Sequence, residues 1–132
     1  MAWVLLVIVL AIFQFVFFGF AVGRARAAHG VPAPAQSGHP VFERYFRVHM
    51  NTLEQLVAFL PAVWLFSQFV DAHWAAALGA LYLIGRMIYF VSYVKDPKSR
   101  GLGFLLTALP TFVMLLGVAW QALMMLLLSY RT

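Results

Sequence analysis

Four long apolar stretches, separated by shorter polar ones, dominate the hydropathy pattern of this chain. They cover residues 2–23, 48–70, 74–93 and 102–130. Each is long enough for a helix, rising about 1.5 Å per residue, to cross a hydrocarbon core of about 30 Å. A helix also satisfies its own backbone hydrogen bonds in lipid. The pattern therefore predicts an all-α integral membrane protein, a bundle of four transmembrane helices forming one domain over residues 1–132.

Basic residues gather in the first and third connections between these stretches. Seven of the nine Lys and Arg residues lie there: Arg24, Arg26, Arg44, Arg47, Lys95, Lys98 and Arg100. With four spans, both connections lie on one side of the membrane, which the positive-inside rule makes cytoplasmic. We therefore expect a multi-pass membrane protein. The basic, His-containing motif favours a bacterial inner membrane, and the endoplasmic reticulum stays open as an alternative. Some of these residues could serve only as topology signals and as anchors for lipid phosphates.

Composition agrees with a membrane protein and excludes several kinds of chemistry. Hydrophobic residues make up 64% of the chain and charged residues 10%, whereas soluble domains are about 45–50% apolar and about 25% charged. The chain has no Cys, which excludes disulfides, thiol catalysis by the protein itself and Cys-based metal sites. The four His residues are spread over a loop, a helix entry and the opposite side, so we expect them not to converge and expect no metal site. The basic residues form no long patch, so we expect no nucleic-acid partner.

Two of the predicted helices carry a row of polar residues on one face, within the membrane. The row on the second helix has the spacing i, i+4, i+7 and consists of Arg47, Asn51 and Glu54. The row on the third helix has the spacing i, i+4, i+7, i+11 and consists of Tyr82, Arg86, Tyr89 and Tyr93. Because these helices run in opposite directions, both rows lie in the same leaflet, with Glu54 and Arg86 each about 10 Å deep.

Charged residues at this depth need a partner or an aqueous cavity, because burying one in hydrocarbon costs about 2.5–3.5 kcal/mol or more. One interpretation is a structural ion pair between Glu54 and Arg86. A second is an interfacial belt of tyrosines. Neither accounts for all the polar residues at this level, whereas a pocket between the two rows does. Such a pocket is cationic with one carboxylate, which suits a small zwitterion of net negative charge.

Two motifs resemble those of the MAPEG family, the membrane-associated proteins in eicosanoid and glutathione metabolism. FERYFRVHMNTLEQLVAFLP, residues 42–61, resembles the family's signature. YLIGRMIYFVSYVKDPKSRG, residues 82–101, resembles the family's third helix and the loop that follows it. The resemblance implies a homotrimer of four-helix subunits that binds glutathione between neighbouring subunits, near the cytoplasmic face.

The resemblance also implies which residues bind glutathione. By position they are Arg47, His49, Asn51 and Glu54 in the second helix, Arg86, Tyr89 and Tyr93 in the third, and Arg26 of a neighbouring subunit. Arg100 matches the arginine that stabilises the glutathione thiolate, so it is the expected catalytic residue. Two positions differ from the leukotriene-forming branch. His49 replaces a glutamine, which looks more like the microsomal transferase branch and bacterial members, and Gln55 replaces a tyrosine contact.

The function implied by the resemblance is that of a detoxifying membrane-bound glutathione transferase. It would join glutathione to lipophilic electrophiles, or act as a glutathione peroxidase on lipid hydroperoxides, with glutathione as co-substrate and no metal. Two alternatives stay open. One is a non-catalytic lipid-binding or scaffold member of the same family. The other is a small proton-coupled multidrug exporter, which is disfavoured because such proteins carry an essential carboxylate in the first helix and residues 2–23 contain none.

Overall fold

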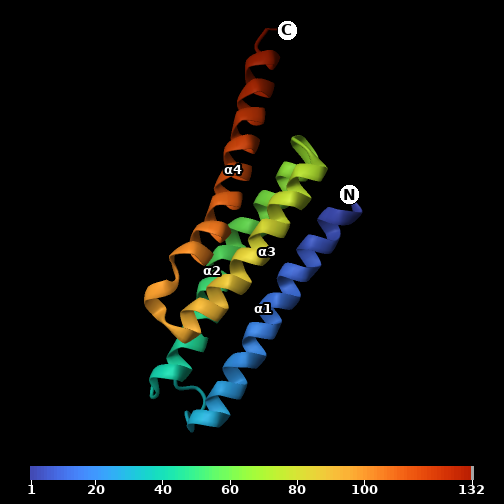
Figure 1. The fold of residues 1–132 in the computed structure, drawn as a ribbon. Coiled ribbons are helices and arrows are strands. Elements are labelled where there is room, and N and C mark those ends of the chain that lie inside the picture. Colours follow the sequence, from blue (N-terminus) through green and yellow to red (C-terminus); the bar gives the residue numbers. More distant parts are fainter. Residues whose placement is uncertain (132) are drawn as a thin grey trace.

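The computed structural model describes residues 1–131 and is almost entirely helical. Its helices are α1 (Ala2–His29), α2 (Pro40–Phe69), α3 (Ala72–Lys95) and α4 (Gly101–Ser129), with a short 3-10 helix, η1 (Pro97–Ser99), before α4. No strand occurs among the described residues. Figure 1 shows the four long helices side by side in one bundle. The prediction of an all-α membrane protein with four helices is confirmed.

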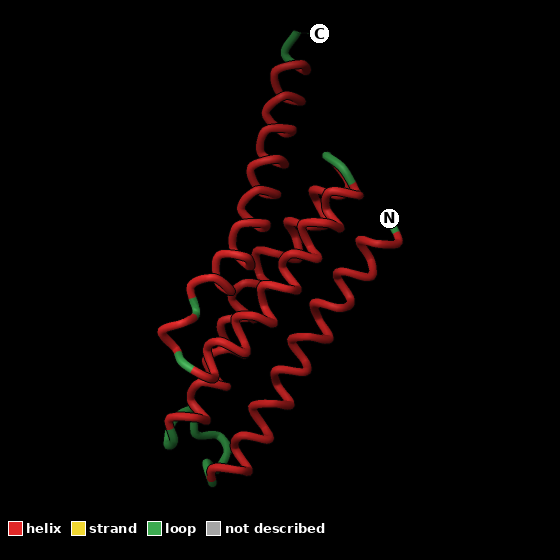
Figure 2. Tube along the Cα trace, in the orientation of Figure 1, coloured by secondary structure: helices red, strands yellow, loops and turns green. Residues whose placement is uncertain are grey.

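The two basic connections lie at the same end of the bundle. In Figure 1 the α1–α2 loop and the α3–α4 connection are together at the bottom, while both termini and the α2–α3 turn are at the top. Figure 2 shows that the loops are confined to these two ends. We call the end that carries residues 24–47 and 95–100 the basic end. Its basic residues therefore lie on one side, as the topology prediction requires.

α1 and α2 extend further at the basic end than predicted. α1 ends at His29 rather than at residue 23, and α2 begins at Pro40 rather than at residue 48. Gly30 terminates α1 in a left-handed conformation (φ 64°), which glycine adopts without steric cost. Pro40 occupies the first turn of α2, where its missing N–H leaves no bond unmade. The predicted ends were placed where the sequence becomes polar, but the helices continue into these polar residues.

Three segments are apolar and long enough to cross a membrane: Ala2–His29, Ala72–Lys95 and Pro97–Ser129. α2 is not among them, because polar residues occupy much of its first half. It nevertheless packs against all three other helices and runs alongside them in Figure 1. The outer surface of the bundle is apolar, with Phe20 75% and Trp74 66% exposed, which suits contact with lipid. The polar first half of α2 therefore does not prevent this helix from taking its place in the bundle.

α3 and α4 approach closely at two glycines. A methyl group at Gly85 would lie 2.7 Å from the backbone carbonyl carbon of Leu106, and one at Gly103 would overlap the backbone of Tyr89. The helices could not keep this separation with any larger residue. The contact holds Tyr89 of α3 against the first turn of α4, next to Arg100, where α4 begins.

Gly103→Ala is expected to destabilise the protein by about 1–3 kcal/mol, because the added methyl forces α4 away from α3. Gly101→Ala is the matched control, since a methyl there meets nothing within 4 Å. Thermal unfolding of both variants in detergent measures the difference. Equal melting temperatures for the two variants would contradict the close approach.

Candidate functional site

Arg86 lies at the centre of a polar cluster that joins α2, α3 and α4, and its side chain is fully buried. Its Nε donates to Thr107 Oγ1 at 2.9 Å. Its Nη1 donates to Asn51 Oδ1 at 2.9 Å and to Thr52 Oγ1 at 3.1 Å. The guanidinium also lies over the ring of Tyr89, 4.2 Å from its centre. A single side chain therefore fixes the relative positions of three helices.

The two threonines can accept from Arg86 because each donates its own proton within its helix. Thr52 Oγ1 donates to the Val48 carbonyl at 2.7 Å, and Thr107 Oγ1 donates to the Gly103 carbonyl at 2.8 Å. This back-bonding satisfies a hydroxyl inside an apolar helix. The lone pairs of both oxygens consequently point toward the guanidinium.

The alternative ion pair between Glu54 and Arg86 is not formed. Glu54 is exposed, whereas the bonds of Arg86 go to one amide and two hydroxyl oxygens. The remaining nitrogen, Nη2, is buried and has no hydrogen-bond partner in the described chain. The charge of Arg86 is therefore not balanced by a carboxylate of its own subunit.

Tyr89 forms a second centre of the cluster. Its ring is buried and stacks on the ring of Tyr93, with centroids 5.5 Å apart and planes at 22°. The guanidinium of Arg86 lies over this ring, and Arg47 on α2 and Arg100 at the start of α4 are close enough for their charges to act on the phenol group.

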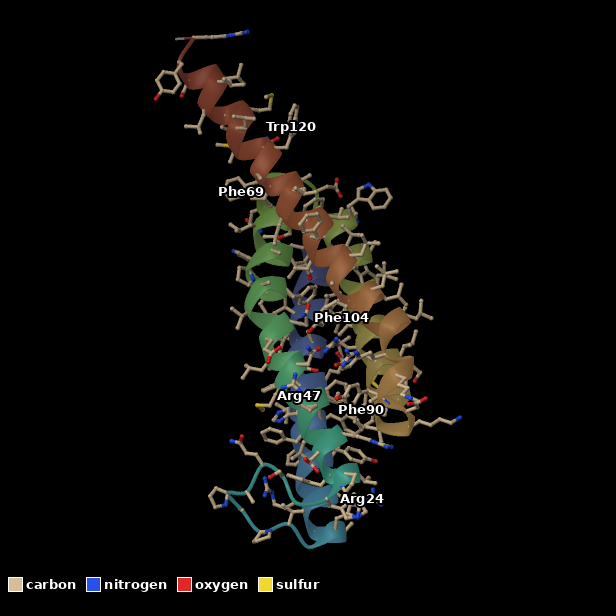
Figure 3. The ribbon with its side chains drawn as sticks, turned by 90° about the vertical axis from the view of Figure 1, so that its left-hand side faces the viewer. Arg24, Arg47, Phe69, Phe90, Phe104 and Trp120 are labelled. Carbon is tan, nitrogen blue, oxygen red and sulfur yellow. The ribbon has the colours of Figure 1, made fainter. Side chains whose placement is uncertain are left out.

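Arg47, Glu54 and Arg100 lie at the edge of the cluster and are exposed in the single subunit. Figure 3 shows Arg47 on α2 at about the level of Phe90, toward the basic end. Arg100 directly precedes α4, and the free N–H groups of that helix's first turn add partial positive charge beside it. These exposed groups are the ones that a bound molecule could reach from outside the subunit.

Two predicted site residues are not brought to this cluster within one subunit. Arg26 is held by its own α1–α2 loop, where Nη1 donates to the Ala35 carbonyl at 2.7 Å and the guanidinium lies 4.7 Å from the Phe42 ring centre. His49 points to α1 and stacks on Phe15 at 4.5 Å, on the other side of α2 from its polar row. No group of three His, Asp or Glu residues that could hold a metal occurs in residues 1–131.

The sequence pattern does not single out Thr52 or Thr107, although both contact Arg86. The one sign that Thr107 belongs to the site was its hydroxyl within the apolar stretch 102–130. A threonine that bonds a carbonyl of its own helix is equally compatible with a lipid-facing position, so this sign did not decide. Tyr82, which shares the spacing of the α3 row, belongs instead to the hydrophobic core, where its ring stacks on Phe59 at 3.8 Å. The α3 row therefore divides between core and site.

Comparison with known proteins identifies the family. The sequence profile of the MAPEG family matches residues 4–120, which include every residue of the polar cluster. This chain belongs to the MAPEG family. The resemblance in the two motifs at residues 42–61 and 82–101 is thereby confirmed.

Relatives of this MAPEG protein include one uncharacterised protein and two named enzymes. An uncharacterised protein of Synechocystis sp. is 42% identical over 123 residues, which are 90% of each chain. Microsomal glutathione S-transferase 2 of Homo sapiens is 36% identical over 107 residues, or 78% of this chain and 73% of that protein. Leukotriene C4 synthase of Cavia porcellus is 36% identical over 84 residues, or 64% of this chain and 56% of that protein.

The cluster of this MAPEG protein is suited to binding an anion. It contains three arginines and two phenols, while its one carboxylate, Glu54, lies at the edge. Arginines bind carboxylates through paired charge-assisted hydrogen bonds, and phenols donate a further bond. Because Asn51 Oδ1 already accepts from Arg86, its amide nitrogen is left to donate to a ligand.

Proposed function

We propose that this MAPEG protein is a membrane-bound glutathione transferase that joins glutathione to lipophilic electrophiles. Reduction of lipid hydroperoxides is a second reaction of the same site. The observation that carries the proposal is the buried guanidinium of Arg86, which bonds to Asn51, lies over the ring of Tyr89 and has no carboxylate partner in its own subunit. The printed name of the human relative, a microsomal glutathione S-transferase, supports the same chemistry.

Glutathione fits the groups that the cluster offers. It carries two carboxylates, one ammonium and one thiol, so its net charge is negative. Arg47 and the amide nitrogen of Asn51 bind carboxylate and peptide oxygens, and Glu54 takes the ammonium. Arg86 acts from behind this first layer, since it is fully buried and holds Asn51 and Tyr89 in place.

Arg100 favours the reactive form of the thiol. A cysteine thiol has a pKa of about 8.5, and a neighbouring guanidinium lowers that pKa by stabilising the thiolate. The thiolate attacks the electrophilic carbon, a carbon–sulfur bond forms, and the leaving group departs with its electron pair. In the peroxidase reaction two glutathione thiols reduce one hydroperoxide to an alcohol and water, and glutathione disulfide forms.

The assembly that completes this site is a homotrimer. Glu54 is exposed on the single subunit although it is expected about 10 Å deep, where charged groups normally face protein, and Arg47 is exposed on the same face of α2. A neighbouring copy would cover them and would bring Arg26 and His49 toward the ligand. With the basic end in the cytoplasm of a bacterial cell, glutathione enters from that side and the lipophilic substrate enters from the bilayer.

The test is calorimetric titration of the purified protein with glutathione, followed by turnover of chlorodinitrobenzene. Saturable binding and conjugation are the expected results. Binding without conjugation would favour the non-catalytic family member, and absence of binding would overturn the proposal. The mass of the detergent-solubilised particle, corrected for bound detergent, tests the trimer separately.

Glu54→Gln is expected to weaken glutathione binding about tenfold, because the ammonium loses a charge-assisted hydrogen bond of about 1.5–3 kcal/mol. Glu43→Gln is the control: it makes the same change on the same helix, roughly 16 Å away by helical rise. Calorimetry on both variants gives the comparison. Unchanged affinity in Glu54→Gln would remove this residue from the site.

A further inference from the structure

A separate cavity of ≈ 530 Å³ lies between α1, α2 and α3 at the basic end. Its lining includes Phe17, Phe20, Arg24, Tyr45 and Phe90. None of the residues assigned to glutathione lines it. The volume lies within the range of about 300–1,000 Å³ that small-molecule sites occupy. The cavity is therefore large enough for a ligand and distinct from the polar cluster.

The inner wall of the cavity is aromatic and fixed in place. Phe90 stacks on Phe18, with ring centroids 4.7 Å apart and planes at 10°. Phe17 and Tyr45 meet the same ring edge-on, at 6.1 Å and 5.8 Å. Because these rings hold one another, the apolar part of the cavity exists before any ligand arrives.

The rim carries a positive charge that its own subunit does not neutralise. Arg24 is exposed and forms no hydrogen bond or ion pair within the described chain. Arg26 is two residues further along the helix and is turned away, toward the loop. Arg44 is engaged too, since its Nη1 donates to the carbonyls of Val94 and Lys95. No Asp or Glu lines the cavity.

The charge and the aromatic wall are arranged along the membrane normal. Arg24 is seven residues beyond Phe17 on α1, so it lies about 10 Å nearer the basic end. Figure 3 shows Arg24 and Phe90 on the same side of the bundle, with Arg24 closer to that end. A cation at the interface with an apolar cavity deeper in the bilayer matches a molecule that has an anionic head and a hydrocarbon tail.

We propose that this cavity is a site within each subunit for an anionic membrane phospholipid. The phosphate binds Arg24, and one acyl chain enters the cavity against Phe17, Phe20 and Phe90. The apolar interior favours a lipid over a free phosphate ion, which would leave most of the cavity unfilled. Lipid binding at this site does not require glutathione, because the two sites share no residue.

Native mass spectrometry of the detergent-purified protein tests this site. The protein is titrated with phosphatidylglycerol and with phosphatidylcholine that carries the same acyl chains. We expect saturable binding of phosphatidylglycerol, tighter than that of phosphatidylcholine. Arg24→Gln should weaken phosphatidylglycerol about fivefold, the effect of one basic residue near an anionic lipid surface, and Arg24→Lys should retain it. Ala28→Phe should also weaken it, because Ala28 lines the cavity.

Two controls separate the cavity from the basic surface around it. Lys98→Gln removes the same charge from an exposed position at the same end, and Ala27→Phe adds the same bulk at an exposed position outside the lining. Both should bind phosphatidylglycerol as the unaltered protein does. The proposal is overturned if Arg24→Gln and Lys98→Gln weaken binding equally, or if Ala28→Phe has no effect. It is also overturned if inorganic phosphate alone displaces the lipid, or if the two lipids bind alike.

Discussion

Arg100→Ala is expected to lose about 10²–10³-fold in conjugating activity while it still binds glutathione. The size of the loss is that seen when one preorganised donor to a developing anion is removed. Arg100 lies where α4 begins, and its charge acts on Tyr89 together with the charges of Arg47 and Arg86. The binding groups for the carboxylates and the ammonium lie on other residues, so affinity should change far less than rate.

Ultraviolet absorbance of the glutathione thiolate, recorded when enzyme and glutathione are mixed, measures this prediction directly. The unaltered protein should develop the thiolate signal, and Arg100→Ala should not. Lys98→Ala provides the control, because Lys98 is a second exposed cation three residues from α4. Normal thiolate formation in Arg100→Ala would show that another group activates the sulfur.

Arg86→Met is expected to weaken glutathione binding tenfold or more, although Arg86 is fully buried. The substitution releases Asn51 and Tyr89, which Arg86 holds by a hydrogen bond and by a cation–π contact. Methionine is unbranched and apolar, so it can occupy part of the buried volume of Arg86 without an unpaired charge, although it leaves the Asn51 oxygen without its donor. The effect should therefore appear in affinity rather than as complete loss of the fold, and calorimetry together with melting temperature separates the two.

Thr107→Val gives a milder version of the same experiment. It removes one of the three hydrogen bonds of Arg86 and should weaken glutathione binding in the same direction, by a few-fold. Thr111→Val is the control, because Thr111 bonds only to the Thr107 carbonyl, at 3.5 Å. If Thr107→Val and Thr111→Val bind glutathione as tightly as the unaltered protein, Arg86 does not position the site.

The meeting of the two polar rows could be predicted from sequence, because helical spacing and membrane depth are both sequence properties. The two rows do meet in the structure, where Arg86 of α3 donates a hydrogen bond to Asn51 of α2. Which polar residue of a row faces inward depends on how each helix is rotated, and neighbouring side chains determine this. Glu54 faces outward, so the ion pair considered as an alternative is not formed. Thr52 and Thr107 bond Arg86 instead, and the pattern does not distinguish them from lipid-facing residues.

The positions of Arg26 and His49 show a second limit of sequence reasoning. The predicted role of Arg26 depends on a neighbouring subunit, and within one subunit Arg26 turns toward its own loop. His49 was assigned from its position in the second helix, and it turns toward α1. Position in a family pattern does not say which way a side chain turns within one subunit. Their roles remain predictions that the trimer measurement and the glutathione titration address together.

The glycine contact between α3 and α4 bears on how far the rest of the protein can vary. Main-chain packing at Gly85 and Gly103 sets the distance between Tyr89 and the start of α4, so the placement of Arg100 beside Tyr89 does not depend on bulky side chains. The outward faces of α1 and α4 take no part in that contact. Substitutions on those faces should therefore leave the spacing of α3 and α4 unchanged.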